Sequence, residues 1–340
     1  MRTGYPLEFE KLCGSLRLGK LAAEPKALTG GHLHRMFEVT TDTGKYAVKA
    51  LNPQVMRRSE AMRNILAAER VANMAAKVLP AAPAKQFDCG VMPEADGQYY
   101  LVFDWIDGGT RCPEQIELTH CKTMGKLLAD LHGVDFSALG LTDTPSFDEK
   151  PIDWDFYLQQ GQRKRSGFVA ILRKNLEHLY RWKARTMAAA TALEQGRVIS
   201  HGDLDPKNVV WQDDSPVIID WEAAGAIHPL HDLVETALYW SFDKRGKIVP
   251  KKFKAFVNAY HRRRPIDCNN WQPVLDKGFS ANLGWLEYSL KRALGLEGAD
   301  ELEQRRGAEQ VRGTIRALRR HERDTCRIIN WLEELQAGLG

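Results

Sequence analysis

The stretch that decides the fold is His201-Gly202-Asp203-Leu204-Asp205-Pro206-Lys207-Asn208, followed shortly by Ile218-Ile219-Asp220-Trp221-Glu222. Both segments place carboxylates in loops that follow short apolar runs. Phosphoryl transfer needs a carboxylate that receives the proton of the attacking hydroxyl, together with hard oxygen ligands for Mg²⁺. Asp203 is the candidate base, Asn208 follows it five residues later, and Asp220 ends the next short apolar run, so Asn208 and Asp220 are candidate Mg²⁺ ligands. The two segments therefore predict a phosphoryl-transfer site.

These motifs resemble those of the aminoglycoside phosphotransferase and choline kinase family, which is related to the protein kinases. That family's catalytic loop reads His-Gly-Asp, four variable residues and Asn, and its metal motif reads Ile-Asp-Trp-Glu. The resemblance implies that Asp203 is the catalytic base and that His201 supports the loop. It implies that Asn208 and Asp220 hold Mg²⁺. It further implies a protein-kinase-like fold and ATP as the phosphate donor, with GTP left open.

The first hundred residues carry strand patterns. Phe37–Thr41 and Lys45–Leu51 are rich in β-branched and aromatic residues, and the Asp-Gly turn chemistry between them predicts a hairpin. Apolar residues near 3.6-residue spacing predict a helix from about Ser59 to Lys77, with Ser59 as its N-cap. Tyr99–Phe103 has the composition of a further buried strand.

Lys49 lies within the predicted strand Tyr46-Ala47-Val48-Lys49, which is similar to the kinase strand whose lysine reaches the α- and β-phosphates. A charge in a buried strand needs a partner. Glu69, on the following helix, is the predicted partner, whereas Glu60 in the first turn is interpreted as a surface residue. The alternative is a solvated Lys49 on an edge strand.

Two further segments fall where kinases bind the nucleotide. Gly30 and Gly31 precede the hairpin, in the position of the loop that covers the phosphates, although a Gly-Gly pair is usually only a turn. Asp104, Trp105 and Ile106 occupy the position of the hinge, whose backbone groups would bond the adenine edge. An ordinary interlobe strand is the alternative there.

The predicted fold class is α+β, with two lobes. The N-terminal nucleotide-binding lobe is expected over residues 1–103, the hinge over 104–110, and a helical lobe with the catalytic loop and acceptor pocket over 111–340. Two short strands, 197–200 and 216–220, interrupt the second lobe. Its helices are predicted at 121–132, 167–193, 230–241, 253–263, 281–294 and 309–336.

Composition limits the classes of function. The chain has 340 residues, 44% of them hydrophobic and 27% charged, which is typical of a globular protein. A net charge of +4 is too small for a protein that coats nucleic acid. Basic runs such as 163–165 and 262–264 are interpreted as solvated helix faces, so no nucleic-acid partner is expected.

Location can also be predicted from the sequence. No apolar stretch approaches the roughly 18 residues that a membrane span requires, and the N-terminus lacks the apolar core of a secretion signal. The six cysteines are scattered and form no C-x-x-C pair. Scattered cysteines favour reduced thiols in a cytoplasmic protein. Because no apolar span is found in the sequence, no membrane partner is expected.

Carboxylates and aromatic rings suit a cationic or polyhydroxyl acceptor. Asp153, Asp155, Glu222, Trp285 and Glu287 are the predicted acceptor residues. An aminoglycoside-like antibiotic is the favoured acceptor, and the alternative is a metabolic kinase for choline, a sugar or an amino-alcohol.

Two other functions stay open. A catalytically silent nucleotide-binding scaffold is disfavoured because the acidic positions are intact. A kinase for protein acceptors is disfavoured because no Ala-Pro-Glu segment follows Glu222. The oligomeric state is left open.

Overall fold

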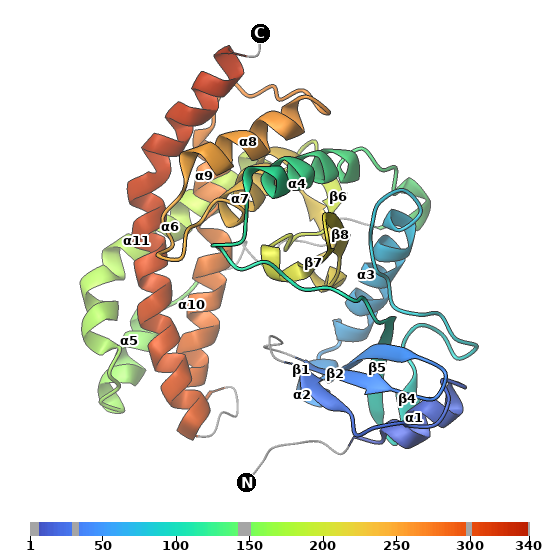
Figure 1. The fold of residues 1–340 in the computed structure, drawn as a ribbon. Helices are drawn as coiled ribbons and strands as arrows, with labels where there is room; N and C mark the ends of the chain where they lie inside the picture. The colour runs from blue at the N-terminus through green and yellow to red at the C-terminus, as the bar shows by residue number, and fades with distance from the viewer. Residues whose placement is uncertain (1–6, 29–33, 142–150, 297–300, 339–340) are drawn as a thin grey trace.

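The computed structural model describes residues 7–28, 34–141, 151–296 and 301–338, and these form two lobes (Figure 1). The N-terminal lobe is built on an antiparallel five-stranded sheet in the order β1-β2-β3-β5-β4. Its strands are β1 (Lys26–Leu28), β2 (Arg35–Thr40), β3 (Lys45–Ala50), β4 (Glu94–Ala95) and β5 (Gln98–Asp104). Its helices are α1 (Phe9–Ser15), α2 (Pro53–Met56) and α3 (Ala61–Ala75).

The predicted hairpin is present as β2 and β3. Phe37 lies opposite Val48, and the Thr41 N–H donates to the Gly44 carbonyl to close the turn at 2.8 Å. Val39 and Val48 are fully buried, because alternate residues of each strand face the core of this lobe. β3 is thereby fixed between β2 and β5, and Lys49 is a central-strand residue rather than an edge residue.

The helix predicted after the hairpin is α3, and its predicted N-cap is wrong. The N-cap position is Glu60, without a side-chain cap, and not Ser59. The chain first forms the short helix α2, where the Asn52 side chain accepts from the Gln54 N–H. The turn that leaves α2 takes up Ser59, so α3 begins later than the apolar pattern indicates.

The C-terminal lobe is mainly helical. α11 runs along one side of it, with α10 beside it (Figure 1). Two-stranded ribbons β6–β9 and β7–β8 lie on the side that faces the N-terminal lobe. The helices are α4 (Leu118–Leu131), α5 (Trp154–Arg163), α6 (Val169–Ala192), α7 (Pro229–Tyr239), α8 (Pro250–His261), α9 (Gln272–Lys277), α10 (Ser280–Ala293) and α11 (Glu301–Ala337). The short strands are β6 (Val198–Ser200), β7 (Val209–Gln212), β8 (Ser215–Ile218) and β9 (Gly225–Ile227).

The six predicted helices of this lobe are all present, while α5 and α9 were not predicted. α11 begins eight residues before the predicted start at Glu309. Its first two turns are rich in charged residues, so the apolar stripe on which the prediction depended is weak there. Within the described residues, we find no helix with the length and apolarity of a membrane span.

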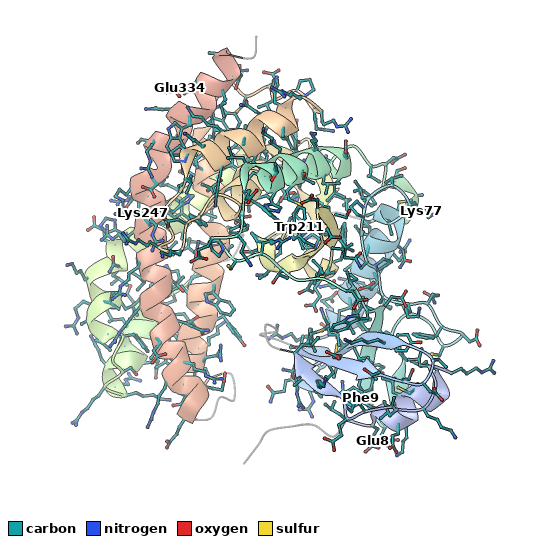
Figure 2. The ribbon with its side chains drawn as sticks, in the orientation of Figure 1. Glu8, Phe9, Lys77, Trp211, Lys247 and Glu334 are labelled. Carbon is teal, nitrogen blue, oxygen red and sulfur yellow. The ribbon has the colours of Figure 1, made fainter. Side chains whose placement is uncertain are left out.

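The segment between the lobes is tied to the ribbon that follows the catalytic loop. Gly109 and Trp211 exchange two backbone hydrogen bonds, at 3.0 and 3.2 Å. Trp211, on β7, lies near the middle of the molecule (Figure 2) and is almost completely buried. The interlobe connection is therefore held close to the polar loops of the second lobe.

α4 and α8 pack unusually closely at Gly125. A Cβ atom added there would lie 2.3 Å from the Phe256 carbonyl oxygen of α8, whereas one added at Gly284 of α10 meets nothing within 4 Å. Gly125→Ala should therefore destabilise the chain by about 1–3 kcal/mol, the usual cost of overpacking. Gly284→Ala, the matched control, should be neutral or gain up to about 1 kcal/mol from helix propensity. Urea unfolding measures both, and equal effects would contradict this packing.

Candidate active site

The loop after β6 is fastened by a buried imidazole. His201 is fully buried, and its Nε2–H donates to the Ile219 carbonyl at 2.9 Å. The Asp203 N–H donates to His201 Nδ1 at 3.3 Å. Burial lowers the pKa of His201, so the ring stays neutral and can accept at Nδ1. His201 therefore links the loop that carries Asp203 to the segment that carries Asp220.

Gly202 is required between these two residues for conformation and for space. Its φ is +75°, in the left-handed region that side chains disfavour. A Cβ atom would also lie 2.4 Å from the Ala223 carbonyl oxygen. The glycine thus lets the catalytic loop pass directly over the segment that follows Asp220.

The Asp203 carboxylate is oriented by two neighbours. Asn208 Nδ2 donates to the Asp203 carbonyl at 2.8 Å and to Oδ2 at 3.0 Å. Lys207 Nζ lies 3.2 Å from the same Oδ2 atom. The contacts of Asn208 and Lys207 with the Asp203 carboxylate therefore both fall on Oδ2. Lys207 was not predicted; its four-residue spacing from Asp203 across a short 3₁₀ turn is the only signal in the sequence.

Asp220 has a strained backbone. Its φ of +62° is in the left-handed region, which is uncommon for residues other than glycine and tends to occur at functional sites. Lys49 Nζ donates to Asp220 Oδ1 at 2.7 Å and also forms an ion pair with Glu222. A side chain of the central N-terminal strand thus contacts the Asp-Trp-Glu segment of the other lobe.

This network corrects the predicted partner of Lys49. Its described ion pairs are with Asp220 and Glu222, not with Glu69. Burial opposes the charge on Lys49, but the two carboxylates outweigh it and keep the pKa of Lys49 above its ordinary value. The prediction considered only the adjacent helix, whereas the partners are about 170 residues away in sequence.

Glu69 instead caps the loop that follows α3. Its buried Oε2 accepts from the Ala84 N–H at 2.7 Å. Burial raises the pKa of Glu69 to about 7, although the Ala84 hydrogen bond and the field of Lys49 lower it. Lys49 and Glu69 therefore interact through their fields without an ion pair.

The donor set suits Mg²⁺. Asp220 offers a carboxylate, and Asn208, whose Nδ2 is bonded to Asp203, keeps its amide oxygen for a cation. Both are hard oxygen ligands, and Mg²⁺ typically takes one or two protein ligands while waters and phosphate oxygens supply the rest. Among the described residues we find no cluster of three His, Cys, Asp or Glu side chains that would cage a metal. The residues thus fit a metal that arrives with a phosphate ligand.

The predicted hinge is only partly available to an adenine. The Trp105 N–H donates to the Lys45 carbonyl at 3.3 Å, so this backbone donor is already used. The Asp104 side chain pairs with Lys85 at 2.6 Å. The Trp105 indole donates to Asp107 at 3.0 Å. The Trp105 N–H thus continues the ladder between β3 and β5, and adenine recognition by the backbone of Asp104, Trp105 and Ile106 stays a prediction.

Of the predicted phosphate-covering loop, Gly30 and Gly31 lie outside the described residues. His34, which follows them, was not singled out in the sequence. Its Nε2 lies 3.7 Å from Glu222 Oε2, and its Nδ1 accepts from the Asn52 N–H at 2.8 Å. Burial lowers the pKa of His34. The start of β2 thus reaches the ion network through a buried imidazole.

The predicted acceptor residues divide between two places. Glu222 pairs with Lys49, on the side of Asp220, and its assignment to the acceptor stays a prediction. Asp153 caps α5 by accepting from the Phe156 N–H at 2.9 Å, and Asp155 accepts from the Tyr180 hydroxyl at 2.7 Å. Asp153 thus caps the N-terminus of α5, while Asp155 joins α5 to Tyr180 of α6.

The two predicted acceptor residues on α10 are likewise in contact with other side chains. Glu287 accepts from the Tyr157 hydroxyl at 2.8 Å and pairs with Lys291 at 3.1 Å. The Trp285 ring lies 5.4 Å from that of Tyr288. Glu287 therefore joins α10 to α5, and the assignment of Trp285 and Glu287 to the acceptor stays a prediction.

The amino-acid sequence is similar to a family of phosphotransferases and to individual kinases. The family model described as "Phosphotransferase enzyme family" matches residues 24–266. A homoserine kinase from Bradyrhizobium sp. (strain ORS 278) is 26% identical over 206 residues, which cover 58% of this chain and 59% of that protein. A homoserine kinase from Rhodopseudomonas palustris (strain BisA53) is 24% identical, with 58% of each chain covered. The match thus spans about three fifths of the length of these curated relatives.

Solved structures resemble the whole chain. A spectinomycin phosphotransferase, in complex with ADP and spectinomycin, has a TM-score of 0.69 at 12% identity and covers 94% of this chain and 99% of its own. A choline/ethanolamine kinase family protein from Mesorhizobium loti has a TM-score of 0.61 at 16% identity, covering 97% and 99%. These likenesses confirm the predicted α+β, kinase-like fold.

The buried carboxyl of Glu69 makes a pH-dependent contribution to stability. Its pKa of about 7 exceeds the ordinary value of 4.5, so this contribution is complete below about pH 4.5 and is lost as the pH rises through 7. Glu69→Gln keeps an oxygen for the Ala84 N–H and does not titrate. From about pH 5 to about pH 8, the variant should gain about 2 kcal/mol of unfolding free energy relative to the wild type.

Urea unfolding at a series of pH values measures this difference. Glu60→Gln, an exposed change at the start of the same helix, is the matched control and should show no such trend. A difference between Glu69→Gln and wild type that stays constant with pH would contradict the buried carboxyl.

Proposed function

The chain belongs to the phosphotransferase enzyme family, and we propose that it transfers the γ-phosphate of ATP to a hydroxyl of a small molecule with the help of Mg²⁺. GTP is the alternative donor. The observation that carries the proposal is the meeting of Lys49, from one lobe, with Asp220, beside a loop that orients Asp203. Asp203 would serve as the base, Asn208 and Asp220 as metal ligands, and Lys49 as the cation that binds phosphate, all where the two lobes meet.

Asp203 is the proposed base. The Asp203 carboxylate oxygen that Lys207 does not hold accepts a hydrogen bond from the acceptor hydroxyl. It takes the hydroxyl proton as the hydroxyl oxygen attacks the γ-phosphorus. The bond between the γ-phosphorus and the β–γ bridging oxygen breaks, and ADP leaves. Lys207 keeps the other carboxylate oxygen paired, so the proton is received on the side that faces the acceptor.

Asn208 and Asp220 are the proposed Mg²⁺ ligands, through an amide oxygen and a carboxylate. When bound, Mg²⁺ neutralises the charge of the phosphate oxygens. Lys49 is the proposed partner of the α- and β-phosphates. Lys49 pairs with Asp220 and Glu222, so we expect phosphate oxygens to replace Asp220 as its partner when the nucleotide binds and Asp220 serves the metal.

Two classes of acceptor fit this scheme. A polycyclic antibiotic is one, since a spectinomycin phosphotransferase shares the fold. A small hydroxylated metabolite is the other, and the sequence similarity to homoserine kinases favours it. A screen of nucleotide consumption across antibiotics, sugars, choline and amino-alcohols tests the proposal, with product mass showing the added phosphate. Absence of nucleotide consumption with every acceptor class, together with absence of Mg·ATP binding, would overturn it.

The roles of the two aspartates can be separated by mutation. Asp203→Ala should lower kcat by roughly 10²–10⁴-fold and leave Mg·ATP affinity nearly unchanged, because the base contacts the acceptor and not the triphosphate. Asp220→Ala should weaken Mg·ATP binding as well as turnover. Steady-state kinetics and calorimetry measure the two effects.

Asp214→Ala, in the exposed turn between β7 and β8, is the control for loss of a nearby carboxylate and should behave like the wild type. Wild-type turnover in Asp203→Ala would remove this residue from the mechanism. Unchanged Mg·ATP affinity in Asp220→Ala would refute its assignment as a metal ligand.

A further inference from the structure

A groove of about 680 Å³ lies between α6 and α11 of the helical lobe, which pack against each other. Its described lining residues all belong to these two helices, so none of them lies in the catalytic loop or in the Asp-Trp-Glu segment. Five of the eight are basic and none is acidic, so this feature is called the arginine groove. Its volume falls within the range of roughly 300–1,000 Å³ that is usual for small-molecule sites.

Four of the five cations come from one face of α11. They occupy positions i, i+3, i+4 and i+7 of the helix, which share a face: Arg316, Arg319, Arg320 and Arg323. With a rise of about 1.5 Å per residue, this row extends about 10 Å along the helix. Lys174 lines the groove from α6. The packing of α6 on α11 thus gathers positive charge from segments about 140 residues apart in sequence.

Folding does not account for this row of cations. Like charges three or four residues apart destabilise a helix, and the row contains several such pairs. The ion pairs of the described residues include none for the exposed cations Arg316 and Lys174. Arg323 lies 3.5 Å from Asp324, which is also paired with Arg327 at 3.2 Å. The arginine groove therefore keeps an excess of positive charge.

Two arginines of the row are held in place by neutral groups. Arg319 Nε donates to Oδ1 of the buried Asn175 at 2.7 Å, and its guanidinium lies over the Trp182 ring, 5.5 Å from the centroid. Arg320 Nη1 donates to the Gly246 carbonyl at 2.7 Å. A guanidinium has five N–H donors, so both arginines keep donors for a ligand. Because they are held in advance, less side-chain entropy is lost when a ligand binds.

Glu322, the carboxylate beside Arg319, is engaged by other side chains. Its Oε2 lies 3.6 Å from Arg319, whereas its Oε1 accepts from the Trp182 indole at 2.9 Å and from Arg181 at 3.0 Å. These bonds hold Glu322 against α6. The lining residues do not include it, so an anion in the groove meets only cations and neutral groups.

The chemistry of the row indicates phosphate as the ligand group. Guanidinium groups match the geometry of phosphate oxygens and bind them through paired hydrogen bonds. A row of cations about 10 Å long requires more than one anionic group. The volume suits a small molecule, and the buried Ile315 gives the groove an apolar part. Linked phosphate groups on a small molecule combine these properties.

We propose that the arginine groove binds a small molecule with two or more linked phosphate groups, at a site separate from the nucleotide site at Lys49. Arg316 and Arg323, at the two ends of the row, bind different phosphate groups of the same ligand. Arg319 and Arg320, fixed between them, bind the middle of the phosphate chain. The site is additional to the proposed phosphotransferase function and does not depend on it.

Inorganic tripolyphosphate is the probe, titrated into the full chain in a calorimeter. Mg²⁺ is left out, which keeps the charges of the probe free and disfavours binding through the proposed metal ligands Asn208 and Asp220. We expect binding with a Kd that rises with added salt, because salt screens partly exposed charges. Absence of binding to the wild type overturns the proposal.

The double variant Arg316→Gln, Arg323→Gln should raise this Kd roughly tenfold or more, because each arginine gives a hydrogen bond between charged groups. Both arginines are exposed, so the variant should fold. The matched control is Arg173→Gln, Arg262→Gln, which removes the same charge from exposed positions on α6 and after α8 that do not line the groove. Its Kd should stay within about twofold of the wild type.

The outcomes test the place and the ligand class separately. An unchanged Kd in Arg316→Gln, Arg323→Gln overturns the arginine groove as the site, and an equal loss in the control variant overturns it too, since net charge alone would then explain binding. A glutamate-rich peptide or a single-stranded oligonucleotide that binds through the same arginines more tightly than tripolyphosphate overturns the small-molecule class. The pair of Lys49 and Asp220 involves neither arginine, so failure of this site leaves the proposed function unaffected.

Discussion

The buried ammonium of Lys49, paired with Asp220 and Glu222, is the interaction on which the arrangement of the site depends. It joins the central strand of one lobe to the Asp-Trp-Glu segment of the other. Removing one partner of a buried ion pair leaves an uncompensated charge, which is costly. The strained backbone of Asp220 and the hydrogen bond from His201 to Ile219 fix the carboxylates against this cation. The two carboxylates thus compensate the buried charge of Lys49 and hold the two lobes together at this point.

α7 is bonded directly to the loop that carries Asp203. Trp240, which follows the last residue of this helix, donates its indole N–H to the Leu204 carbonyl at 2.9 Å. Asp232, on the same helix, accepts from His132 Nε2 at 2.9 Å and is buried. The position of the loop that carries Asp203 therefore depends on α7 as well as on His201.

Much of the fold and of the catalytic loop could be predicted from the sequence, because hairpin chemistry, helix periodicity and the His-Gly-Asp spacing are local patterns. Asp203, Asn208 and Asp220 could be named for the same reason. The partner of Lys49 could not, since Asp220 and Glu222 reach it only after the lobes meet. A cavity among α7, α9, α10 and α11 could not be predicted either, because α7 reads as an ordinary amphipathic helix and α11 closes the cavity some eighty residues later.

We expect Lys49 to exchange Asp220 for phosphate oxygens, and Asp220 to turn to the metal, when Mg·ATP binds. A crystal structure of the full chain with Mg²⁺ and a non-hydrolysable ATP analogue would show this exchange. Lys49 Nζ should then lie within hydrogen-bond distance of the α- or β-phosphate, and Asp220 should be bound to the metal. A structure in which the analogue is bound while Lys49 still pairs with Asp220 and Glu222 would contradict it.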